Sequence, residues 1–194
     1  MNELYPILIG LSVLIFLDPK FYRVLIYSTL FNFVVALISL QAKPFSGAVL
    51  FIFGCVFFPL IAWFAIESCE KEERERIWHL VLIAAITIPA LFIFFSSFQM
   101  SLDHVMLFML FAFSLLAILS ARNLLKFLFI FDIAENSLIL LAYSFFPANV
   151  FTNISTVVFI EIATFLPFVL LTYLTVHIFK KYRSLNPWHL WHSP

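Results

Sequence analysis

The sequence has little charge. Only 11% of its 194 residues are Asp, Glu, Lys or Arg, whereas 64% are hydrophobic. Soluble domains carry about 25% charged and about 45–50% apolar residues. So few charged groups cannot cover a surface in water, and the composition excludes an ordinary soluble domain. We therefore expect an all-α, polytopic membrane protein.

Cysteine and glycine are also scarce. Cys55 and Cys69 are the two cysteines, and they form neither a disulfide framework nor a metal-binding motif. With three glycines, close glycine-mediated helix crossings are not expected to dominate the packing. The 27 phenylalanines must contribute more, and part of the Phe-rich surface should face lipid or neighbouring subunits.

Motifs for catalysis and for nucleic-acid binding are missing as well. The net charge is zero, which gives no basis for nucleic-acid binding. The sequence holds no glycine-rich phosphate loop, CxxC, HExxH or GxSxG motif. We therefore expect no catalytic residue, bound cofactor or metal site in this chain alone.

Long apolar runs are what the sequence does contain. A membrane-spanning helix needs about 20 mainly apolar residues. Prolines at positions 59, 89 and 167 fall inside such runs and are expected to kink them. Seven spans are predicted, at 3–17, 23–40, 46–66, 78–98, 104–120, 124–144 and 152–179.

The basic residues predict an orientation. Of the 11 Lys and Arg residues, ten fall at alternate ends of the predicted spans, and Lys43 alone falls at the other ends. Cytoplasmic loops carry the excess of Lys and Arg. The N-terminus is therefore expected outside and the C-terminus in the cytoplasm of a prokaryotic plasma membrane. We divide the chain into a four-helix part (1–98), a three-helix part (99–180) and a cytoplasmic tail (181–194).

Three acidic residues lie well inside the predicted spans, away from their ends: Asp132, Glu135 and Glu161. An ionised acid at mid-bilayer costs about 2.5–3.5 kcal/mol on insertion scales, so such residues usually line an interior or a water path. Asp132, Glu135 and Asn136 share one helix face at i, i+3 and i+4. Two carboxylates this close in a low dielectric do not both ionise readily. The pair is therefore the predicted proton-transfer station, with Asn136 supporting it.

Other polar residues extend this hypothesis. Glu161, in the last span, is the candidate for the next proton station, although hydrogen bonding to a neighbouring subunit is the alternative. Lys126 and Arg122 lie at the cytoplasmic mouth of the sixth span, where they either feed protons or snorkel to the headgroups. Asn32 and His104 are interpreted as local hydrogen-bonding residues.

The segment from Arg122-Asn123-Leu124 to Asp132 resembles NuoK-type subunits of respiratory complex I. In those subunits an Arg-Asn-Leu opening precedes an acid ten residues after the Arg. The resemblance implies three helices matching the fifth to seventh spans, with Glu161 as the second key acid. The first three spans could be a degenerate copy, since Arg23 precedes Asn32 by nine residues.

A second resemblance is to the HyfE family, hydrogenase-4 component E. It is carried by Arg122-Asn123, Glu135-Asn136, the basic segment 178–185 and the segment 20–23. It implies a non-redox membrane subunit of a group 4 [NiFe] hydrogenase or similar complex-I-like assembly. Nickel–iron and iron–sulfur centres would lie in peripheral hydrogenase-like partner subunits. Antiporter-like subunits would be its neighbours in the bilayer.

Four functions remain open at this point. The first is proton (or sodium) translocation through the buried carboxylates of such an assembly. The second is a structural spacer that holds the complex together without conducting. The third is a subunit of a multisubunit cation/proton antiporter. The fourth is a stand-alone transporter, which the scarcity of glycine and the lack of paired broken helices disfavour.

Overall fold

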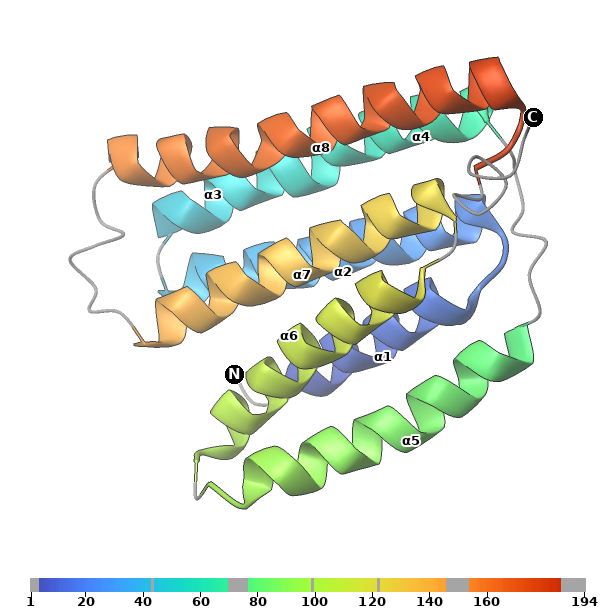
Figure 1. Cartoon of the computed structure of the whole chain (residues 1–194). Helices are drawn as coiled ribbons and strands as arrows, with labels where there is room; N and C mark the ends of the chain where they lie inside the picture. Colours follow the sequence, from blue (N-terminus) through green and yellow to red (C-terminus); the bar gives the residue numbers. More distant parts are fainter. Residues whose placement is uncertain are drawn as a thin grey trace.

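The structure, a computed structural model, describes residues 4–42, 44–69, 77–98, 100–121, 123–145 and 154–185. Those residues contain no β-strand, as the all-α prediction requires. A helical rod occupies each of the seven predicted ranges (Figure 1). The elements are α1 (Tyr5–Leu17), α2 (Phe21–Ala42), α3 (Pro44–Ile52), the π-helical turn η1 (Phe53–Phe57), α4 (Phe58–Ser68), α5 (Ile77–Ser96), α6 (Leu102–Ser120), α7 (Leu124–Phe145) and α8 (Ile154–Tyr182).

Counting only the residues that the structure describes, three rods are long and apolar enough to cross a membrane. They are Phe21–Gln41, the continuous rod Pro44–Ser68 and Leu102–Ser120. Tyr5–Leu17 and Ala85–Ser96 are shorter apolar helices. The all-helical architecture is therefore confirmed for the described residues, whereas the count of seven spans and their orientation stay predictions.

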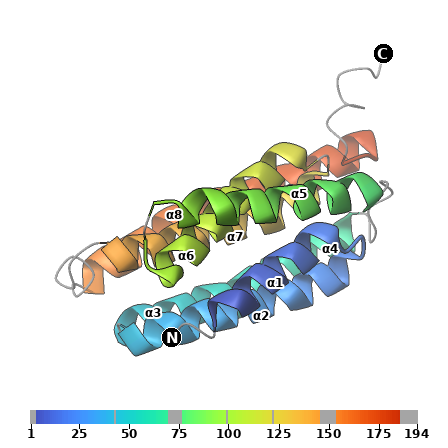
Figure 2. The same cartoon turned by 90° about the horizontal axis from the view of Figure 1, so that it is seen from below.

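The helices form two layers. One layer holds α1, α2 and the α3–η1–α4 rod, and the other holds α6, α7 and α8 (Figure 2). Each helix packs on its counterpart across the interface: α1 on α6, α2 on α7, and the third rod on α8. The counterparts also run in the same direction (Figure 1). This order supports the internal-repeat hypothesis, with α5 packed at the edge against α6 and α1.

Apolar side chains fill the space between the layers and also cover much of the outside. The core includes Phe21, Phe31, Phe129 and Ile133, all nearly inaccessible. Many other large apolar side chains are exposed, among them Ile86 at 63%. Soluble monomers rarely expose contiguous apolar patches larger than a few hundred Å². Such a surface fits lipid or neighbouring subunits.

The third rod is helical throughout, but its α-helical geometry is interrupted in the middle by the π-helical turn η1. Proline at position 59 has no backbone N–H and, inside an α-helix, clashes with the carbonyl four residues earlier. A π-turn accommodates this by shifting the hydrogen bonds by one residue. The N–H of Phe58 accordingly bonds to the carbonyl of Phe53. Pro59 therefore marks a change of helix type, whereas the α-helix continues through Pro89 in α5 and through Pro167 in α8.

Two of the three glycines lie at close helix approaches. A Cβ added to Gly47 would lie 2.4 Å from the backbone N of Leu40, and a Cβ at Gly54 would lie 3.0 Å from Cβ of Asn32. Both contacts bring the third rod against α2. Glycine-mediated contacts were not expected to dominate the packing, and these two positions show where glycine nevertheless permits close approach.

Candidate functional site

The N-terminus of α7 is fixed by Asn123. Its Oδ1 accepts hydrogen bonds from the backbone N–H of Leu125 at 2.8 Å and of Lys126 at 3.4 Å. This is an N-cap, which satisfies donors that the first helical turn leaves without partners. Leu124 N also donates to the carbonyl of Leu185 at 3.1 Å. The asparagine of the Arg-Asn-Leu motif therefore sets the register of the helix that carries Asp132.

Asp132 lies near the middle of α7 and is only 7% exposed. Its Oδ2 accepts hydrogen bonds from Ser28 Oγ at 3.2 Å and Asn32 Nδ2 at 3.1 Å, both from α2. Its Oδ1 accepts one from Asn136 Nδ2 at 3.1 Å. All three donors are neutral. The carboxyl group is thus held between the two layers by hydroxyl and amide groups.

Asn32 connects this carboxyl group to the broken third rod. Its Nδ2 also donates to the carbonyl of Gly54 at 3.1 Å, and its Oδ1 accepts from Asn136 Nδ2 at 3.1 Å. Gly54 O needs this donor, because the N–H of Phe58 is taken by Phe53 and Pro59 offers none. The π-turn thereby supplies the cluster with a backbone acceptor that an unbroken helix would not have. We call Ser28, Asn32, Asp132, Asn136 and the Gly54 carbonyl the carboxyl–amide cluster.

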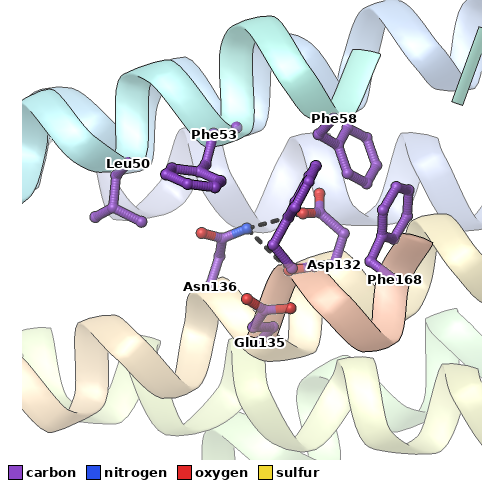
Figure 3. A pocket seen from close by; sticks show the side chains of 9 residues that line it. Leu50, Phe53, Phe58, Asp132, Glu135, Asn136 and Phe168 are labelled. Atoms are coloured by element: carbon purple, nitrogen blue, oxygen red, sulfur yellow. Dashed lines mark hydrogen bonds between the residues drawn. The ribbon is translucent and has the colours of Figure 1, made fainter. Parts of the chain in front are cut away.

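A small cavity adjoins the cluster. It holds about 30 Å³ and is lined by Asp132, Glu135 and Asn136 together with apolar side chains of the third rod and α8 (Figure 3). A water molecule needs about 10–15 Å³ of such space and two to four polar partners. The cavity therefore has room for one or two water molecules in contact with Asp132.

Aromatic rings from the third rod and α8 line one side of this cavity. Phe58 packs against Phe168 with ring centroids 4.5 Å apart, and Phe53 packs edge-on against Phe165 at 5.2 Å. All four rings line the cavity (Figure 3). They separate the polar groups from the exposed face of α8. The dielectric around Asp132 is therefore low, which strengthens every hydrogen bond of the cluster.

Glu135 is half-buried and lines two different cavities. It lines the small cavity beside Asp132 and Asn136. It also lines an apolar groove of about 380 Å³ between α6, α7 and α8. Asp132 and Glu135 therefore share a cavity, as their spacing predicts, but Asp132 forms its hydrogen bonds with Asn136 and α2.

Lys126 is buried, at 2% exposure. Its Nζ donates to the backbone carbonyl of Asp18, at the C-terminal end of α1. A cation at a helix C-terminus interacts favourably with the helix dipole. This is not the outward-reaching arrangement of a snorkelling lysine. Along α7, Lys126 lies six residues, or about 9 Å, from Asp132.

The structure does not describe the side chains of the two remaining residues that were predicted to belong to the site. Arg122 lies outside the described residues. Glu161 belongs to α8, but its side chain lies outside what the structure describes. Their predicted roles as supporting residue and second proton station therefore stay predictions.

Sequence reasoning missed the contribution of α2. Ser28 and Asn32 both bond directly to Asp132, although Asn32 was interpreted as a local hydrogen-bonding residue. The i, i+4 spacing of Ser28 and Asn32 on an apolar helix was the available signal. It mirrors the spacing of Asp132 and Asn136 on α7.

Comparison with known proteins gives no assignment. No protein-family model, curated protein or solved structure matches this chain. The resemblance to HyfE and NuoK-type subunits therefore stays a prediction carried by the motifs alone.

Proposed function

We propose that the chain is a seven-span membrane subunit that contributes to proton (or sodium) translocation through its buried carboxyl groups. Its N-terminus would lie outside and its C-terminus in the cytoplasm of a prokaryotic plasma membrane. The observation that carries the proposal is Asp132, buried between apolar layers, bonded to neutral donors within the described part of the chain and adjacent to a water-sized cavity. Acids inside membrane bundles usually mark ion or proton pathways.

The surroundings of Asp132 suit a group that changes its protonation state. Three hydrogen-bond donors stabilise the ionised carboxylate, whereas burial among phenylalanines favours the neutral acid. A nearby Lys or Arg would fix the negative charge, but the donors to Asp132 in the described part of the chain are a hydroxyl and two amides. Glu135, on the same cavity, offers a second carboxyl group for proton exchange.

Assembly with other subunits is the second part of the proposal. The motifs at Arg122-Asn123 and Glu135-Asn136 support a complex-I-like or group 4 [NiFe] hydrogenase assembly. The exposed apolar side chains of the outer helices would contact antiporter-like neighbours as well as lipid. Nickel–iron and iron–sulfur chemistry would belong to peripheral partner subunits.

Co-purification tests this assembly. An affinity tag on the C-terminal end allows the chain to be isolated from native membranes in mild detergent. Mass spectrometry should then identify antiporter-like membrane subunits and a nickel-containing partner, with iron and nickel present in the sample by elemental analysis. Isolation of the chain alone, or with partners of another class, would overturn the hydrogenase assignment.

A structural spacer is the second candidate function. Its support is that every hydrogen-bonding atom of the Asp132 carboxyl has a partner, as a purely structural buried acid requires. A spacer needs the cluster only for helix packing. It therefore predicts that neutral, hydrogen-bonding replacements of the acids leave translocation unchanged.

A further inference from the structure

A second polar cavity lies at the end of the bundle where α1 and α6 begin and α2 and α7 finish. It holds about 230 Å³. Polar groups from all four helices line it: Tyr5, Ser39, Ser101, Asp103, His104 and Tyr143. We call this space the vestibule. By the predicted topology it faces the outside of the membrane.

Ser39 indicates what the vestibule holds. Its side chain is completely buried, and its Oγ has no hydrogen-bond partner among the residues that the structure describes. A buried polar group without a partner costs about 1–3 kcal/mol, so such groups are normally satisfied by ordered water. At about 30 Å³ per water molecule, the vestibule has room for several. Water is thus the occupant that fits the volume and the polar lining of the vestibule.

The mouth of the vestibule carries two proton-exchanging groups. Asp103 and His104 are half-buried and lie in the first turn of α6. The ring of His104 is fixed, because Nδ1 lies 2.5 Å from Ser101 Oγ and the ring packs 4.9 Å from that of Phe145. The helix dipole favours the negative charge of Asp103 there. The phenols of Tyr5 and Tyr143 complete the titratable groups of the lining.

The vestibule lies on the same α2–α7 seam as the carboxyl–amide cluster. Ser39 follows Asn32 by seven residues on α2, and Tyr143 follows Asn136 by seven on α7. At 1.5 Å per residue, the two sites are about 10 Å apart along the seam. Buried Val35 and Leu140 lie in this interval. A short apolar constriction therefore separates the vestibule from the cluster.

We infer that the vestibule is a water-filled port through which protons pass between bulk solvent and the buried carboxyl–amide cluster. Asp103 and His104 exchange protons with bulk water at its mouth, and Ser39 lies at its buried end. This inference rests on the proposed function, because a port needs a site that it serves. Its hydration, however, can be measured without any translocation assay.

Cysteine labelling tests the hydration. The variant Ser39→Cys is made in the full chain with Cys55→Ala and Cys69→Ala, in sealed native membrane vesicles of either orientation. A charged, membrane-impermeant thiol reagent should modify it about tenfold or more faster than Ser12→Cys, because the reactive thiolate forms in water. Ser12 is the matched control, since it is 1% exposed and bonded to the carbonyl of Ile9. Reaction should occur from one side of the membrane only.

A lipid-facing control separates water from lipid access. Ile86 is 63% exposed on α5, so Ile86→Cys should react with a lipophilic maleimide but not with the charged reagent. If Ser39→Cys behaves like Ile86→Cys, or reacts with neither reagent, the vestibule is dry and the inference fails. That result would leave the translocation proposal to its own test.

Footprinting of the unmodified protein gives an independent readout. Hydroxyl radicals generated from water should oxidise Tyr5 and Tyr143, which line the vestibule, faster than Phe129, which is 1% exposed in the apolar core. Equal protection of all three side chains would contradict a hydrated vestibule, whether or not the cysteine variants fold.

Discussion

Replacing Asp132 with leucine should destabilise the protein by about 3–5 kcal/mol. Leucine has the same number of side-chain heavy atoms in the same branched arrangement, with bulkier methyl groups, but accepts no hydrogen bond. The Ser28 hydroxyl and one N–H of Asn32 would lose their carboxylate acceptor, whereas Asn136 Nδ2 keeps the backbone carbonyl of residue 132 and Asn32 Oδ1. Each abandoned buried donor costs about 1–3 kcal/mol, partly offset by the favourable burial of leucine. The free energy of unfolding, measured by titrating the detergent-solubilised chain with a denaturing detergent, reports the loss.

Asp132→Asn is the matched control for this prediction. The amide oxygen can still accept from Ser28 and Asn32, and the new NH2 then faces Asn136, whose own amide N–H groups keep two other acceptors. We therefore expect Asp132→Asn to cost about 1 kcal/mol. Equal stability of Asp132→Leu and the unmodified protein would show that the cluster does not hold the two layers together.

Gly47→Ala is expected to have the next largest effect on stability. The added Cβ would lie 2.4–2.5 Å from the backbone N and Cα of Leu40. Backbone atoms cannot move aside as a flexible side chain can, so α2 and α3 would have to separate. Overpacking of this kind costs about 1–3 kcal/mol. The melting temperature of the purified chain in detergent should fall accordingly.

Gly10→Ala is the comparison for that measurement. A Cβ at Gly10 would meet no atom within 4 Å. Alanine also favours a helix interior over glycine by about 0.5–1 kcal/mol. Gly10→Ala should therefore leave the melting temperature unchanged or raise it. A similar fall in both variants would mean that the close approach at Gly47 is not what limits its substitution.

The positions of the helices follow directly from the sequence. Each predicted apolar range is occupied by a helical rod, because a run of apolar residues between charged or proline-containing connections leaves no other favourable structure in lipid. The break in the third rod was only partly predictable. Pro59 indicated a distortion, but whether the helix kinks or forms a π-turn depends on the partner that receives the freed carbonyl.

The candidate site was predicted only for the helix that carries the acids. The i, i+4 spacing of Asp132 and Asn136 placed both on one face, and the structure joins them by a hydrogen bond. The contribution of Ser28 and Asn32 depends on α2 packing against α7, a contact between residues about 100 positions apart. Single-helix periodicity contains no information about such a pairing.

The close approach of helix backbones was the other feature that the amino-acid composition did not predict. Three glycines indicated that glycine-mediated crossings would not dominate the packing, but their number did not show that Gly47 and Gly54 both lie where the third rod meets α2. The number of glycines does not report where two backbones approach. The same limit applies to Lys126, whose burial against the end of α1 arises from tertiary contact.

The central claim is that Asp132 and Glu135 exchange protons during translocation. The most direct test uses a double variant that combines Asp132→Asn and Glu135→Gln. The assembly that contains it is isolated and placed in vesicles, and proton movement is measured while the assembly's own redox reaction drives it. Glu67→Gln is the control, since Glu67 is a carboxyl outside the site that accepts a hydrogen bond from Tyr22. The account predicts an assembled complex that keeps its redox turnover but moves few or no protons. Proton movement per turnover equal to that of the unmodified assembly would contradict it.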